Sequence, residues 1–259
     1  MKNRIGIVVL ATNLYFILGL RFIRRFHHFY KGDGEIVFYF FSDEDPTPYV
    51  PEDMNVKFYH QSHSNWRDGT NSKFKNIVNI QYDLRREVDY VYYFDADTNV
   101  NQDFTEEWFL GELVSGEHYG NRSWLANGAG FNSCLGGHDY VSPMTGLPYT
   151  YRYGAFFGGR TQDMINLCDT LMKWQIIDSD KDYEPPNNDE GYLNAYFHYN
   201  SPTYTVPTEK FAFLISDKGG YEELVRFPEA DVPHLKQELL ANKDKLFNLV
   251  YRQIVYDNE

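Results

Sequence analysis

The chain contains few cysteines, few basic residues and no repeats. Only Cys134 and Cys168 occur in 259 residues, which excludes a disulfide-stapled scaffold and a structural zinc site built from several thiolates. Lysine and arginine number 24 against 37 aspartates and glutamates, and the net charge of −13 argues against a broad nucleic-acid surface. Internal repeats and low-complexity tracts are also lacking, so a solenoid or a disordered chain is not expected.

A long apolar segment is missing as well. The apolar run at 5–11 is followed by Thr12, Asn13 and Tyr15, which interrupt it before it reaches the twenty residues that a membrane span requires. A short signal sequence is the alternative, but a buried strand followed by a helix explains the same region. We therefore expect no transmembrane segment, and the two free thiols suit a cytoplasmic protein.

The composition is that of a globular protein, with 42% hydrophobic and 18% aromatic residues. Short apolar runs rich in β-branched and aromatic residues indicate buried strands, and helical patterns lie between and after them. Because such an alternation forms a parallel sheet covered on both faces, we expect an α/β fold with a Rossmann-like, mainly parallel sheet. Strands are expected at 5–11, 35–41, 56–60 and 88–94, and helices at 14–30, 72–87, 104–115, 161–177 and 189–199.

No proline- or serine-rich linker divides the chain, which predicts a single domain over residues 1–259. A charged tail begins at about residue 218 and includes a helical pattern at 232–247. Residues 116–150 are rich in Gly, Asn, Ser and Tyr and have no periodicity. A long loop of this kind within a compact domain is usually functional.

The strongest chemical signal is Asp95-Ala96-Asp97, directly after an apolar strand. Open α/β sheets bind ligands at the carboxyl ends of their strands. Two adjacent carboxylates repel each other unless a cation lies beside them, and oxygen ligands select Mg²⁺ or Mn²⁺, whose shell substrate phosphates complete. One Asp capping the next turn is the structural alternative. A phosphatase of the haloacid-dehalogenase type also carries Asp-x-Asp after a strand, but with Thr where this chain has Asn99.

Two further motifs follow. Residues 153–159 place two phenylalanines between glycines, which indicates a strand whose backbone closely approaches a neighbour; a β-bulge or tight helix packing is the structural alternative. Asp189 and Glu190 open the helical pattern at 189–199, where the helix dipole favours negative charge. Helix capping alone also explains that pair.

In this order and spacing, the three motifs resemble the family 6 glycosyltransferases over roughly residues 4–215. That family includes the histo-blood-group A and B transferases, the α-1,3-galactosyltransferases and shorter microbial relatives. The resemblance implies a GT-A fold and an Mn²⁺-dependent, retaining transfer of galactose or N-acetylgalactosamine. The sugar would pass from a UDP-sugar donor to a glycan acceptor hydroxyl in α-1,3 linkage. Mg²⁺ is the alternative ion.

The resemblance also implies roles for individual residues. Glu190 would stabilise the anomeric carbon, either as a nucleophile or beside an oxocarbenium-like centre, and Asp95 and Asp97 would hold the metal ion. Donor-binding positions would be Leu10, Ala11, Thr12, Tyr15, Trp66, Thr70, Lys73, Asp95, Ala96, Tyr153, Gly154, Ala155, Asn188 and Asp189.

The chain departs from the family pattern at several positions. Lys73 and Asn188 stand where the family has Arg and His, and the segment 128–131 lacks the family's acceptor-contacting His. Tyr153 and Ala155 are larger than the residues that best accommodate an acetamido group, so we expect UDP-galactose as the donor. A non-catalytic relative that binds a nucleotide-sugar or a glycan is the alternative from another functional class.

Overall fold

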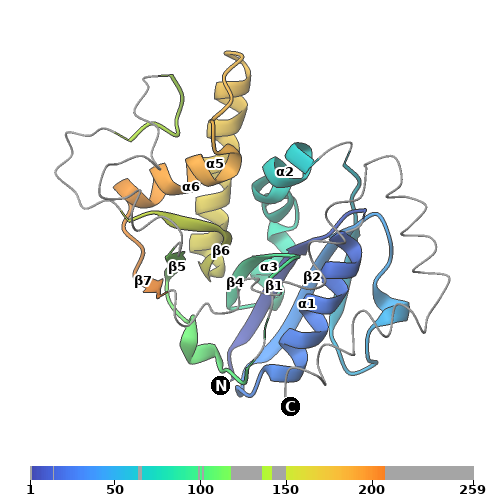
Figure 1. The fold of residues 1–259 in the computed structure, drawn as a ribbon. Helices are drawn as coiled ribbons and strands as arrows, with labels where there is room; N and C mark the ends of the chain where they lie inside the picture. Colours follow the sequence, from blue (N-terminus) through green and yellow to red (C-terminus); the bar gives the residue numbers. More distant parts are fainter. Residues whose placement is uncertain are drawn as a thin grey trace. The chain divides into compact units, whose positions relative to one another are not determined.

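A computed structural model of the chain describes residues 2–13, 15–63, 66–98, 100, 102–117, 136–141 and 150–207. Over these residues the fold is mixed α/β, with seven strands in the sheet and helices that flank it (Figure 1). The α/β expectation is therefore confirmed. Contacts group the chain into two compact units. The single-domain expectation is untested, and the helix expected at 232–247 lies outside the described residues.

The first unit contains three parallel strands in the order β3-β2-β1. Aromatic side chains of helix α1 pack on this sheet: Phe16 and Phe26 make edge-to-face contacts with Phe40 and Phe38 of β2. Burial explains the apolar runs of β1 and β2, whose central residues are buried, whereas the residues of β3 are partly buried or exposed. The elements are β1 (Arg4–Leu10), α1 (Tyr15–Phe29), β2 (Glu35–Ser42), a 3₁₀ turn (Thr47–Tyr49) and β3 (Val56–His60).

The second unit contains strands in the order β4-β6-β5-β7, in which β5 runs antiparallel to β6 and parallel to β7. Helices α2 and α6 both pack against α5, and α6 also packs on β6. The elements are α2 (Trp66–Asn79), α3 (Gln81–Glu87), β4 (Tyr90–Asp95, whose last two residues belong to the first unit), β5 (Leu113–Glu117), β6 (Arg152–Arg160), α5 (Thr161–Ser179), α6 (Asn188–Tyr199) and β7 (Tyr204–Val206).

Most expected elements are confirmed with small shifts at their ends, but two differ. The helix expected over 104–115 is wrong: the region forms a 3₁₀ turn at Glu106–Trp108 and then β5. Its apolar residues serve a strand, since β5 pairs with β6 on one side and β7 on the other. The helix expected over 72–87 is divided at Ile80 into α2 and α3.

The close approach that the glycines of 153–159 predict is confirmed in β6. A Cβ atom at Gly158 would lie 2.3 Å from the backbone oxygen of Val91 on β4, so no larger residue fits there without displacing backbone. Beside this contact the rings of Tyr92 and Phe156 stack with centroids 5.8 Å apart. No helix within the described part of the chain is both long and apolar enough to cross a membrane.

Candidate active site

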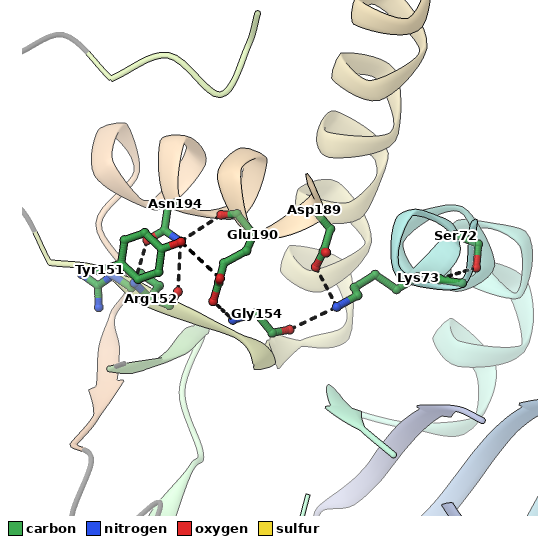
Figure 2. Close-up of polar contacts among 9 residues, drawn as sticks. Ser72, Lys73, Tyr151, Arg152, Gly154, Asp189, Glu190 and Asn194 are labelled. Carbon is green, nitrogen blue, oxygen red and sulfur yellow. Dashed lines mark hydrogen bonds and ion pairs between the residues drawn. The ribbon is translucent and has the colours of Figure 1, made fainter. Parts of the chain in front are cut away.

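The carboxylate of Glu190 is held between helix α6 and strand β6 in the second unit (Figure 2). The backbone N–H of Gly154 donates a hydrogen bond to Oε1 at 2.8 Å, and the hydroxyl of Tyr151 donates to Oε2 at 3.1 Å. Each carboxylate oxygen therefore receives one hydrogen bond from the part of the chain that the structure describes. Glu190 lies in the first turn of α6, so the helix carries its charge close to the end where the dipole stabilises it.

Burial dominates the acid–base behaviour of Glu190. It raises the pKa of this carboxyl from an ordinary value near 4.5 to about 7, and the adjacent charge of Asp189 raises it further. The hydrogen bonds from Gly154 and Tyr151 and the charge of Lys73 oppose this shift. A carboxyl that changes charge near neutral pH is typical of functional sites, where burial is maintained at the expense of stability.

Asp189 is paired with a lysine inside the second unit. Lys73 on α2 places its Nζ 2.7 Å from Oδ2 of Asp189 and 3.3 Å from the carbonyl oxygen of Gly154, to which it donates. The same ammonium group lies over the ring of Tyr93, 4.7 Å from its centroid. Gly154 therefore connects the two acidic residues: its N–H binds Glu190 and its carbonyl binds the lysine that holds Asp189 (Figure 2).

Asn194 links the first turn of α6 to β6 through hydrogen bonds. The sequence motifs do not include this residue. Its amide donates to the carbonyl oxygens of Glu190 and Arg152, and its own oxygen accepts the N–H of Arg152. Asn194 follows Glu190 by four residues, one helical turn along the same face, and this spacing is the signal that could have revealed it. Tyr151 was also missed, although it lies two residues before Tyr153.

Arg152 anchors the start of β6 from within the sheet. Its guanidinium donates to the hydroxyls of Ser115 and Thr205 on the neighbouring strands and lies over the ring of Phe197. Burial lowers the pKa of this guanidinium to about 10. The arginine is thus a structural link that joins β5, β6 and β7 next to the residues that hold Glu190.

The remaining donor-binding candidates of the second unit lie close to Gly154, Asp189 or Lys73 along the chain, and they differ in exposure. Tyr153 is partly buried and Ala155 is buried, both on β6. Asn188 begins α6 with a positive φ of 48°, a left-handed conformation that Asn tolerates better than most residues. Thr70 is partly buried on α2, which Trp66 begins.

The candidates of the first unit lie at the end of β1 and in the loop after it. Leu10 is the last residue of β1, and Ala11 is buried with its N–H bonded to the carbonyl of Phe41. The hydroxyl of Thr12 lies 3.2 Å from Nδ1 of His63. Tyr15 starts α1 and donates its N–H to the carbonyl of Thr12.

Asp95 and Asp97 lie in a turn at the end of β4. The N–H of Thr98 donates to the carbonyl of Asp95, both carboxylate residues are partly buried, and Ala96 between them is buried. Further along, the N–H at Nε of the fully buried Arg25 donates to the carbonyl of Val100. Helix α1 thereby supports the segment that follows the two aspartates.

The donor set in this turn fits a hard divalent cation only in part. Two carboxylates supply the hard oxygen ligands that Mg²⁺ and Mn²⁺ prefer. The buried hydroxyl oxygen of Thr98 has no hydrogen-bond partner within the described residues, so it adds an oxygen near the pair. No cluster of three or more His, Cys, Asp or Glu side chains suited to a metal occurs among the residues that the structure describes. An ion held here needs ligands in addition to these described residues.

A comparison with known protein families assigns the chain to a family. The sequence profile described as Glycosyltransferase family 6 matches residues 1–214. The chain belongs to glycosyltransferase family 6. The family 6 match also accounts for the mixed α/β arrangement, which is that of a GT-A type fold.

Two named proteins share low sequence identity with this chain. The chain is 23% identical over 213 residues to "Histo-blood group ABO system transferase 2" of Rattus norvegicus, covering 80% of this chain and 63% of the rat protein. It is 22% identical over 202 residues to "O-antigen biosynthesis glycosyltransferase WbnI" of Escherichia coli, covering 74% of this chain and 84% of that protein. The aligned region thus spans less than two thirds of the rat protein.

Proposed function

We propose that this family 6 chain is a retaining glycosyltransferase. It transfers galactose, or N-acetylgalactosamine, from a UDP-sugar to a hydroxyl of a glycan acceptor in α-1,3 linkage. The observation that carries the proposal is the environment of Glu190: a carboxylate fixed by Gly154 and Tyr151, with a pKa near neutrality and a second carboxylate beside it. The names of the rat and bacterial relatives support a glycan as the acceptor.

Glu190 performs the step that retention of configuration requires. As the bond between the anomeric carbon and the phosphate oxygen breaks, its electron pair leaves with UDP, and the ionised carboxylate stabilises the positive charge at carbon. A covalent glycosyl–enzyme intermediate and direct attack by the acceptor on the leaving-group side are both compatible with one carboxylate. In either case the acceptor hydroxyl forms the new bond and gives its proton to an oxygen of the departing diphosphate.

Asp189 binds hydroxyl groups of the donor sugar in this proposal, and Lys73 holds its carboxylate for that purpose. Tyr153 and Ala155 limit the space for an acetamido group, which favours UDP-galactose. Asp95 and Asp97 hold Mn²⁺ or Mg²⁺, and the ion supplies neutralisation of the diphosphate charge. The acceptor is a glycan whose identity depends on contacts outside these residues.

The proposal is tested by incubating the purified protein with each UDP-sugar, Mn²⁺ and an array of glycan acceptors, and measuring UDP release and labelled product. The expected result is transfer by the wild type, with UDP-galactose preferred, and loss of transfer in Glu190→Gln with nearly unchanged UDP affinity. A protein that binds UDP-sugar but releases no UDP is a binding module instead. Unchanged kcat in Glu190→Gln would remove this residue from the reaction.

A further inference from the structure

Tyr151 contacts Glu190 from a position that the sequence motifs do not include. The residue lies immediately before β6 and is 3% exposed, so solvent does not supply an alternative partner for its hydroxyl. That hydroxyl donates to Oε2 of Glu190 at 3.1 Å, while the other carboxylate oxygen accepts the N–H of Gly154. Figure 2 shows the ring pointing across β6 toward the first turn of α6.

The hydroxyl of Tyr151 acts as a donor over the whole physiological pH range. Burial, together with the neighbouring carboxylates of Glu190 and Asp189, raises the pKa of this phenol well above its ordinary value. The phenol is therefore protonated whenever Glu190 is ionised. A hydrogen bond from a neutral donor to a carboxylate stabilises the charged form more than the protonated form.

Within the described residues, three titratable side chains have the largest effects on the Glu190 carboxyl. Lys73 on α2 favours its ionised form, Asp189 on α6 disfavours it, and Tyr151 before β6 donates to it. Lys73 is directly paired with Asp189, so much of its charge is offset there. Tyr151 is consequently the side chain whose contact is directed at the Glu190 carboxylate itself.

We propose that Tyr151 is a positioning residue that favours the ionised form of Glu190 and orients its carboxylate for transfer. The inference rests on the proposed function for its effect on catalysis, but the contact with Glu190 is independent of it. Tyr151 transfers no proton and forms no bond to substrate. Its loss therefore moves the pH at which Glu190 becomes active and does not abolish the reaction at high pH.

The test compares the wild type with Tyr151→Phe, which removes one oxygen and keeps the ring. The matched control is Tyr183→Phe, because Tyr183 donates to Asp139 at 2.7 Å and does not contact Glu190 in any described hydrogen bond. In Tyr151→Phe, the acid limb of the kcat–pH profile is expected to move upward by about one pH unit. At pH 7 this corresponds to roughly a fivefold lower kcat, which recovers by pH 9.

A second measurement does not depend on turnover. Protein labelled with ¹³C at the glutamate carboxyl carbon is titrated by NMR without donor or acceptor, and the Glu190 signal is assigned by its absence in Glu190→Gln. The same upward shift is expected in Tyr151→Phe and none in Tyr183→Phe. If the wild type transfers no sugar, the proposed function fails, whereas this titration still decides the role of Tyr151.

Two results would overturn the role of Tyr151. An identical Glu190 titration in the wild type and Tyr151→Phe overturns the inference, as does a uniform fall in kcat at every pH. Should Tyr151→Phe not fold, 3-fluorotyrosine at position 151 keeps the hydroxyl and makes it a stronger donor. The titration of Glu190 is then expected to move to lower pH, and an upward or absent shift contradicts the proposal.

Discussion

Lys73 and Asp189 form a buried ion pair in which Nζ lies 2.7 Å from Oδ2 and the two side chains are 2% and 5% exposed. The pair joins α2 to the first turn of α6, next to Glu190. Because a desolvated charge is costly without its partner, the position of Asp189 depends on Lys73. The sequence indicates both residues as donor-binding candidates, but only the folded chain brings them into contact with each other.

Breaking this pair is expected to destabilise the protein strongly. Lys73→Met leaves the Asp189 carboxylate buried without its partner charge, and the expected loss in free energy of unfolding is about 3–5 kcal/mol. Lys73→Met combined with Asp189→Asn removes both charges and is expected to cost less than the single change. The control is Lys173→Met, which breaks a surface pair with Asp169 and is expected to cost less than about 1 kcal/mol. Urea unfolding measures the free energy of unfolding of all three variants. Equal losses in Lys73→Met and Lys173→Met would contradict the argument from burial.

Glu190 is expected to make stability depend on pH. Its folded pKa of about 7 lies above the ordinary value of 4.5, so the folded state is favoured at low pH and loses stability as pH rises through this window. Between pH 5 and pH 8 the wild type is expected to lose about 2–3 kcal/mol relative to Glu190→Gln, which cannot ionise. If the free energy of unfolding of the two proteins, measured with urea, has the same pH dependence, burial does not raise the pKa of Glu190.

Gly154 is expected to tolerate no side chain without loss of activity. A Cβ atom there would lie 3.3 Å from Cβ of Glu190 and 3.4 Å from Oδ2 of Asp189, so Glu190 must shift by a few tenths of an ångström and Asp189 is brought into contact. We expect Gly154→Ala to lower kcat by tenfold or more, on the order of the cost of small misplacements at reactive centres. Gly191→Ala is the control, since its Cβ would be equally crowded but by Asp139 and Pro185. Equal effects of the two changes on kcat would argue against a specific role for Gly154.

The aspartates after β4 are expected to govern metal binding. Changing even the outer partners of a metal site commonly lowers affinity by about 10–100-fold, so Asp95→Asn and Asp97→Asn are each expected to weaken Mn²⁺ binding at least about tenfold. Electron paramagnetic resonance of Mn²⁺ titrated with protein and UDP gives the affinity. Asp103→Asn serves as the control because this aspartate is exposed and pairs at 3.8 Å with Lys31. Full transferase activity in EDTA would refute the role of the ion.

The local patterns of the sequence were sufficient for much of the fold. Continuous apolar runs correctly indicated buried strands, because parallel strands covered on both faces have no polar side to reveal. The pattern at 104–115 predicts a helix, but the region forms a 3₁₀ turn and β5, because the pairing of β5 with β6 and β7, which are distant in sequence, overrides local periodicity. The break at Ile80 between α2 and α3 likewise has no proline or glycine to signal it.

For the candidate site, the sequence by itself determined the family and proposed the acidic residues, since the motifs that carry them are short and contiguous along the chain. Only the tertiary structure decided that Gly154 and Tyr151 donate to Glu190 and that Lys73 pairs with Asp189. These contacts join residues 36 to 116 positions apart, and no local pattern encodes them. Their physical consequence, a carboxyl whose pKa is raised to about 7, arises from burial, which is a property of the folded chain and not of any motif.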